Sequence, residues 1–229
     1  MGSPSARGNQ SGKRQLRCGS REERRARQQG YTLIAGLDEA GRGCLFGDVY
    51  AAAVILPERS ITGGLNDSKQ LTAEQREALE PLIQERSLAW AVATASAAEV
   101  DRINIYQASR LAMKRALEAL TVRPDFLLVD ALTLDTLIPQ RALIHGDAIS
   151  VSIAAASILA KTARDRAMVE WDRTYPQYGL ARHKGYGTAE HLRALAEHGP
   201  TPHHRTTYEP VRRLSPAPAA GGLQQEALW

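Results

Sequence analysis

Short apolar runs alternate with longer helical patterns along most of this chain. Runs rich in Ala, Val, Ile and Leu that are too short for helices predict strands at residues 31–37, 49–56, 88–96, 126–129 and 142–144. Helical periodicity or capping residues predict helices at 72–83, 104–120, 150–171 and 188–197. Because strands come early and helices late, we expect an α/β domain with helices on both faces of a mixed sheet.

Two threonines mark predicted helix starts. Thr72 is followed three positions later by Gln75, which is the spacing of a capping box. Thr188 precedes the last predicted helix and is also a good N-cap. Pro57 ends the second predicted strand, since it cannot donate a ladder hydrogen bond.

The two ends of the chain differ in composition from its middle. Residues 1–29 are rich in Arg, Gln, Gly and Ser, and their one candidate helix, 21–27, has no apolar stripe to bury. We therefore expect a disordered basic tail, with a nucleic-acid-binding arm as the alternative. Residues 30–214 form the expected domain, and 215–229 read as a flexible tail.

Composition narrows the class of protein. The chain has 229 residues and a formal net charge of +4, which suits nucleic acid as a partner without requiring it. No apolar run reaches the roughly 18 residues of a membrane span, and no apolar signal-peptide core follows the basic start. The only cysteines are Cys18 and Cys44, so we expect a reducing cytoplasmic setting and no disulfide scaffold.

Carboxylates follow three of the predicted strands: Asp38 with Glu39, Asp130, and Asp147. Strand ends are where α/β sheets bind ligands, so these side chains can meet in one cleft. Such a set can hold two divalent ions, one beside an attacking water and one beside a leaving oxygen. Taken singly, each Asp is also typical of a turn or a helix cap, and Asp147 suits the helix that begins near Ser150.

A Gly-Arg-Gly turn follows the first acidic pair. Gly41 and Gly43 let backbone N–H groups approach an anionic ligand, and Arg42 adds positive charge. Adjacent carboxylates repel each other, which favours a bound cation such as Mg²⁺ that takes oxygen ligands. The combination indicates phosphodiester chemistry.

Several motifs follow one another in a fixed order. The most specific is Gly36-Leu37-Asp38-Glu39-Ala40-Gly41-Arg42-Gly43. After it come Leu65-Asn66-Asp67-Ser68-Lys69, Leu127-Leu128-Val129-Asp130, Gly146-Asp147-Ala148, His183-Lys184-Gly185-Tyr186-Gly187-Thr188 and Gly199-Pro200-Thr201-Pro202-His203-His204-Arg205. In this order they resemble type 2 ribonuclease H, the bacterial ribonuclease HII branch in particular, over roughly residues 31–213.

The resemblance implies a ribonuclease H-like fold with a five-stranded mixed sheet flanked by helices and a C-terminal helical part. It implies a monomeric endonuclease that uses Mn²⁺ or Mg²⁺, two ions in the active complex. Such an enzyme cuts the RNA strand of RNA–DNA hybrids, and incises 5′ to ribonucleotides embedded in duplex DNA, leaving 3′-hydroxyl and 5′-phosphate ends.

Residue roles follow from the same resemblance. The implied catalytic and metal-binding residues are Asp38, Glu39, Asp130 and Asp147. The implied substrate contacts are Gly41, Arg42 and Gly43 at the RNA–DNA junction, Tyr186 against a sugar, and Lys69 and Lys184 as candidate phosphate contacts. The small side chains of 152–161 are expected to serve helix packing near the site.

The chain departs from the family pattern after Gly43. Cys44-Leu45-Phe46-Gly47-Asp48 stands where a Pro and small residues are usual. We expect Phe46 and Asp48 to alter the approach to the junction, and Asp48 to add negative charge near the acids.

The C-terminal tip Gln225-Glu226-Ala227-Leu228-Trp229 looks like a bacterial sliding-clamp-binding peptide. Leu228 and Trp229 would enter an apolar pocket of the clamp. A frayed end, or a tip packed on its own domain, is the alternative.

Two other functions stay open. A phosphatase or phosphotransferase could use the same acids, although the chain lacks a Walker A sequence. A nucleic-acid-binding protein without catalysis is the other, although all four acids are present.

Overall fold

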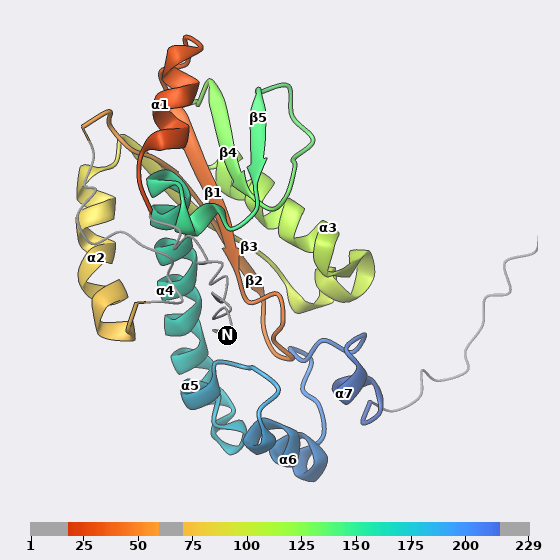
Figure 1. The fold of residues 1–229 in the computed structure, drawn as a ribbon. Coiled ribbons are helices and arrows are strands. Elements are labelled where there is room, and N and C mark those ends of the chain that lie inside the picture. The colour runs from red at the N-terminus through yellow and green to blue at the C-terminus, as the bar shows by residue number, and fades with distance from the viewer. Residues whose placement is uncertain (1–17, 60–70, 216–229) are drawn as a thin grey trace, which may run out of the picture.

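The computed structural model describes residues 18–59 and 71–215. One five-stranded sheet has the order β3-β2-β1-β4-β5 (Figure 1). The strands are β1 (Ile34–Ala40), β2 (Val49–Ile55), β3 (Ala89–Ala95), β4 (Phe126–Asp130) and β5 (Gln140–Leu143). β1, β2 and β3 pair antiparallel, whereas β1–β4 and β4–β5 are parallel. The predicted mixed sheet is confirmed.

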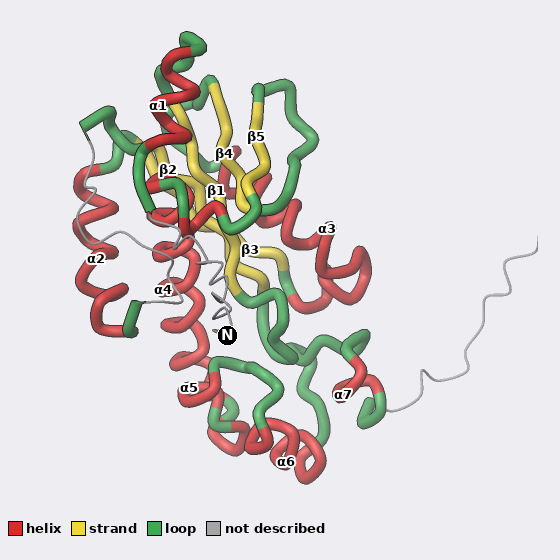
Figure 2. Tube along the Cα trace, viewed as in Figure 1, coloured by secondary structure: helices red, strands yellow, loops and turns green. Residues whose placement is uncertain are grey.

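Helices cover both faces of the sheet. They are α1 (Arg21–Gln28), α2 (Ala73–Arg86), α3 (Ala97–Glu118), α4 (Val151–Thr174), α5 (Leu180–His183), α6 (Ala189–His198) and α7 (Glu209–Arg212). Two 3₁₀ turns, η1 (Gly146–Ala148) and η2 (Pro176–Tyr178), flank α4. The core on one face is shared with α3, and the core on the other with α2 and α4. Helices α5 to α7 gather beyond the end of α4 as a C-terminal helical part (Figure 2).

Close packing of α4 on β1 sets the position of the site. Residues 151–160 of α4 are all buried, and most are Ala, Ser or Ile. A Cβ on Gly36 of β1 would lie 2.1 Å from the carbonyl carbon of Ser152. Only glycine allows this approach, and it fixes α4 directly beneath the strand that ends in the acidic pair.

The predicted helix caps are largely confirmed. Thr72 and Gln75 form a reciprocal capping box at α2, and the Thr188 side chain accepts a hydrogen bond from the His191 N–H at α6. Helix α3 begins at Ala97, not at the predicted residue 104, because Ser96 starts it with a second capping box. Asn104 instead forms a kink, with φ 68°.

The prediction of a disordered tail is wrong for residues 18–29. Arg21–Gln28 form α1, whose buried face consists of Glu23 and Ala26. The sequence pattern failed because the face that packs carries a carboxylate instead of an apolar stripe, and that carboxylate finds hydrogen-bond donors inside the molecule. Residues 1–17 and 216–229, with the clamp-like tip, lie outside the described residues.

None of the helices in the described ranges has both the length and the apolar character needed to cross a membrane.

Candidate active site

Three of the four predicted acids line one pocket. Asp38 and Glu39 come from β1, and Asp130 comes from the end of β4. Leu37 pairs with Val129 across these parallel strands, so the next residue on each strand, Asp38 and Asp130, falls at the same level. Sheet register therefore brings together carboxylates that are 92 positions apart in the sequence.

Asp147 lies behind this group. It is 3% exposed, does not line the pocket and sits in η1, whose Gly146 N–H donates to Asp130 Oδ1 at 2.7 Å. The cap of α4 is Ser150, whose side chain accepts a hydrogen bond from Ile153 N–H, so Asp147 is not needed for that role.

The acids share one electrostatic environment. Burial, followed by the charges of Glu39 and Asp130 and then of Asp147, holds the pKa of Asp38 well above its usual range. A hydrogen bond from Ser157 acts in the opposite direction. Since several carboxylates destabilise one another here, a bound cation would relieve the repulsion.

The donor set fits a hard divalent cation. All four side chains offer carboxylate oxygens, which Mg²⁺ and Mn²⁺ accept. No group of three His, Cys, Asp or Glu side chains in residues 18–59 and 71–215 is already arranged around a common point. Protein donors already contact the three pocket acids: Arg42 contacts Glu39 at 3.2 Å, the Gly146 N–H contacts Asp130, and the Glu39 N–H contacts Asp38 at 2.7 Å. The carboxylates would therefore supply part of a coordination shell that water and substrate oxygens complete.

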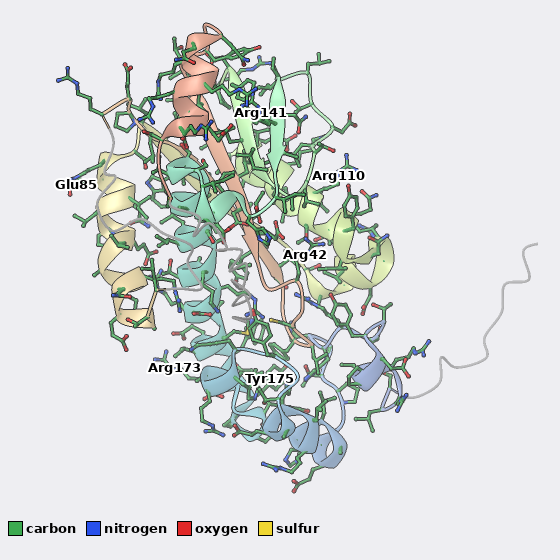
Figure 3. All side chains as sticks on the ribbon, viewed as in Figure 1. Arg42, Glu85, Arg110, Arg141, Arg173 and Tyr175 are labelled. Atoms are coloured by element: carbon green, nitrogen blue, oxygen red, sulfur yellow. The ribbon has the colours of Figure 1, made fainter. Side chains whose placement is uncertain are left out.

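The Gly-Arg-Gly turn and Tyr186 line the same pocket as the acids. Gly41 has φ +94°, and a Cβ there would lie 2.1 Å from Nε of Arg164. Figure 3 labels Arg42 near the middle of the molecule, between the sheet and the C-terminal helical part. Tyr186 is 42% exposed and forms an isolated antiparallel bridge with Cys44, which joins the two segments.

Comparison with known proteins decides the family. The model of the family described as Ribonuclease HII matches residues 35–211. A ribonuclease HII of Solibacter usitatus is 56% identical over 203 residues, which are 89% of each chain. This chain belongs to the ribonuclease HII family.

Solved structures support the fold. The ribonuclease H2 of Pyrococcus horikoshii has a TM-score of 0.68 and 26% identity over 79% of this chain and 96% of that one. A structure described as a complex of PCNA with ribonuclease HII from Archaeoglobus fulgidus has a TM-score of 0.67 and 23% sequence identity, and covers 82% of this chain and 98% of that one. At this identity the match supports the fold alone. As a ribonuclease HII, the chain is a nuclease that hydrolyses the RNA strand of RNA–DNA hybrids.

Two buried arginines, whose roles the sequence did not indicate, brace the Gly-Arg-Gly turn and the Tyr186 loop of this ribonuclease HII. Arg205 donates to the Arg42 carbonyl at 2.9 Å, and the Tyr208 hydroxyl donates to the same oxygen at 2.6 Å. Arg164 donates to the carbonyls of Lys184 and Phe46. Both arginines are fully buried and bond to backbone oxygens from distant parts of the chain, so neighbouring sequence does not indicate these contacts.

A chain of neutral histidines holds the Tyr186 loop. The Thr201 N–H donates to His204 Nδ1 at 2.9 Å, which leaves His204 Nε2 to donate to His191 Nε2 at 3.1 Å. His191 Nδ1 then donates to the Tyr186 carbonyl at 3.0 Å. Burial lowers the pKa of His191 to about 4 and that of His204 to about 3, so both rings are neutral at pH 7.

Of the two predicted lysines, Lys184 is within the described residues and does not line this pocket. Lys184 donates to the Ala181 carbonyl at 2.7 Å and lines a separate hollow between α2 and α4. Lys69 lies outside the described residues. Ser157 and Lys161 of α4 line the acid pocket instead. Their i, i+4 spacing within an otherwise small, apolar helix was the signal, and interpreting that stretch only as packing was incomplete.

The expectation for Phe46 is wrong. Its side chain is 0% exposed and packs edge-on against Trp171 and His204 in the core of the C-terminal helical part, so it presents no surface to a ligand. Asp48 accepts a hydrogen bond from the Ala97 N–H at 3.3 Å. Burial raises the pKa of Asp48, while this bond and the nearby His203 and Arg205 lower it, so basic groups offset the charge of Asp48.

Proposed function

We propose that this ribonuclease HII also incises 5′ to single ribonucleotides embedded in duplex DNA, in the cytoplasm and as a monomer, leaving 3′-hydroxyl and 5′-phosphate ends. The observation that carries the proposal is that one pocket combines an acidic group, Asp38, Glu39 and Asp130, with the Gly41–Gly43 turn and Tyr186. The first set suits phosphodiester hydrolysis, and the second suits recognition of a sugar–phosphate junction.

The acids would hold Mg²⁺ or Mn²⁺. Asp38, Glu39 and Asp130 would be the principal ligands, and Asp147 behind them would complete the site. Bound there, two divalent ions lower the pKa of a water and stabilise the leaving oxygen. Lys161 of α4 also lines the pocket, forms an ion pair with Asp165 at 2.6 Å and would attract the scissile phosphate. Ser157 would keep Asp38 oriented through their hydrogen bond.

Ribonucleotide selectivity would come from close backbone approach. The 2′-hydroxyl distinguishes RNA from DNA, and backbone groups can bond it only where the chain comes near. Gly41 and Gly43 have no side chains to obstruct that approach, and Gly43 has open space around its Cα. The exposed part of Tyr186 would pack on the sugar of the next nucleotide.

Cleavage of one defined duplex tests the proposal. An end-labelled DNA duplex with a single ribonucleotide is incubated with Mg²⁺, with Mn²⁺ and with EDTA, beside an Asp130→Asn variant. We expect a metal-dependent cut immediately 5′ of the ribonucleotide that the variant lacks. Cleavage of a long hybrid only would refute the junction activity, and cleavage of neither would favour a binding protein without catalysis.

The C-terminal tip supplies a second, independent proposal on sequence grounds. Residues 225–229 resemble a clamp-binding peptide, and the Archaeoglobus fulgidus structure is itself described as a PCNA:ribonuclease HII complex. Deletion of 225–229 should abolish co-purification with the sliding clamp and leave cleavage intact. Loss of cleavage together with the tip would instead indicate a tip that packs on its own domain.

A further inference from the structure

Helix α1 precedes the part of the chain that the family model matches, which begins at residue 35. It is nevertheless fastened to the active domain. Glu23 Oε1 accepts hydrogen bonds from Ser150 Oγ at 2.6 Å and from Ser152 N–H at 3.0 Å. These donors belong to the N-terminus of α4, where a carboxylate is favoured by the helix dipole. α1 is therefore a built element of the molecule.

The opposite face of α1 is cationic. Arg21, Arg24, Arg25 and Gln28 are exposed, follow the i, i+3, i+4, i+7 spacing of one helix face and together line a hollow. Glu22, the other acid of the helix, pairs with Arg141 of β5 at 3.0 Å. Figure 3 labels Arg141 beside α1. Within residues 18–59 and 71–215, none of the three exposed arginines forms an ion pair.

Some other exposed arginines form ion pairs, whereas the exposed Arg86 of α2, Arg102 of α3, Arg123 and Arg193 of α6 form none with another described residue and lie on separate elements. Arg173 pairs with Glu170 at 2.7 Å, and both Arg212 and Arg213 pair with Glu209. A paired arginine adds little to the field outside the protein, whereas three unpaired ones on one face attract a polyanion.

The segment that leads into α1 is joined to the turn that carries Asp147. The Gly19 carbonyl accepts a hydrogen bond from Val151 N–H at 3.2 Å, and Ser150 N–H donates to the carbonyl of Gly146, the neighbour of Asp147, at 2.8 Å. Asp147 is the acid that would complete the site. A duplex centred on the pocket has about 34 Å of helix axis in ten base pairs, enough to extend past neighbouring elements.

We propose that the Arg21, Arg24 and Arg25 face of α1 binds the phosphodiester backbone of the substrate duplex on one side of the cut. The contact is to phosphates and does not depend on base sequence. It rests on the proposed function in taking a duplex centred on the acid pocket as the ligand.

Binding measured as a function of arm length tests this. The full chain and an Arg21→Gln, Arg24→Gln, Arg25→Gln variant are titrated in EDTA with fluorescent duplexes that carry one ribonucleotide and arms of increasing length on either side. For the unchanged chain, we expect affinity to rise about tenfold when one arm, and only that arm, passes a threshold length. The variant should lose this rise, and its slope of log affinity against log salt should be shallower by about 2 to 3.

A matched variant controls for net charge. Arg173→Gln, Arg212→Gln and Arg213→Gln remove the same charge from paired arginines, and Arg173 lies near the lower end of α4, away from α1 (Figure 3). Equal losses in both variants, or no loss in either, would overturn the assignment of α1. Maximal cleavage rates at saturating short duplex should be equal in all three proteins.

The two proposals fail separately. If the unchanged chain binds in an arm-dependent way but does not incise, the junction activity is refuted and the role of α1 stands. If it incises without any arm-length effect, α1 is refuted and the junction activity stands.

Discussion

The two sides of the candidate site are held by different means. On the acid side, Asp38 and Asp130 are placed by the pairing of β1 with β4, and their charges oppose one another. On the substrate-facing side, the Gly41–Gly43 turn and the Tyr186 loop have no strand to hold them. Buried Arg164 and Arg205 and the histidine chain fix their backbones. Regular structure thus holds the acids, whereas side chains that reach across the fold hold the turn and the loop.

Asp38→Asn, a change on the acid side, should have the largest effect on cleavage. Cleavage should fall on the order of 10³-fold, since one carboxylate of the site is lost. The metal-free protein should nevertheless become more stable at pH 7. The folded-state pKa of Asp38 is raised, so its favourable contribution is present below the unfolded value near 3.9 and is lost as pH rises. The amide of the Asp38→Asn variant does not ionise, so the variant does not lose this stability as the pH rises.

Thermal unfolding in EDTA checks this. The variant should melt above the unchanged protein at pH 7, and the gap should narrow towards pH 4. A lower melting temperature for the variant at pH 7 would contradict the like-charge account of the pocket.

Gly41→Ala should damage the substrate-facing side. The new Cβ would meet Arg164 Nε at 2.1 Å, at a backbone φ of +94°. We expect a loss of about 1–3 kcal/mol in unfolding free energy and reduced incision at the ribonucleotide. Gly43→Ala is the matched control, because a Cβ there meets nothing within 4 Å. Equal destabilisation by both changes in urea unfolding would refute the Arg164 contact as the cause.

The histidine chain should make the protein sensitive to acid. The folded-state pKa values of His191 and His204 are lowered from 6.5 to about 4 and about 3. The stability that the neutral rings contribute is therefore complete above pH 6.5 and is lost as the pH falls from 6.5 towards these two values. Replacing His204 by Gln should reduce the slope of unfolding free energy by about 1.4 kcal/mol per pH unit between pH 6 and pH 4. Exposed His198→Gln is the control, and an identical slope in both variants would show that the buried pair does not titrate.

The smallest expected effect distinguishes two lysines. Lys161→Gln, at the acid pocket, should raise KM for a ribonucleotide-containing duplex about tenfold, the ~1.4 kcal/mol of one charge-assisted contact. Lys184→Gln should leave KM within twofold, because Lys184 lines another hollow and does not line the acid pocket. A larger rise in KM for Lys184→Gln than for Lys161→Gln would instead support the prediction from the sequence that Lys184 contacts a phosphate.

The same division explains what could be read from the sequence. Asp38, Glu39 and Asp130 could be predicted as site residues, because each follows an apolar run and this pattern is local in the sequence. The five strands and the caps Thr72 and Thr188 are local as well. Arg164 and Arg205 satisfy carbonyls far away in the chain, and α1 buries a glutamate where a pattern search expects an apolar residue. These features depend on tertiary partners that no single segment specifies.

The parallel pairing of β1 with β4 has a consequence for synthesis of the chain. The elements β2, α2, β3 and α3 lie between these strands in the sequence. The paired residues Leu37 and Val129 are therefore far apart along the chain. Asp147, Lys161 and Tyr186 follow later still. A ribosome therefore synthesises Asp38 and Glu39 long before it adds the last residues that line their pocket. The complete pocket can form only after synthesis has passed Tyr186.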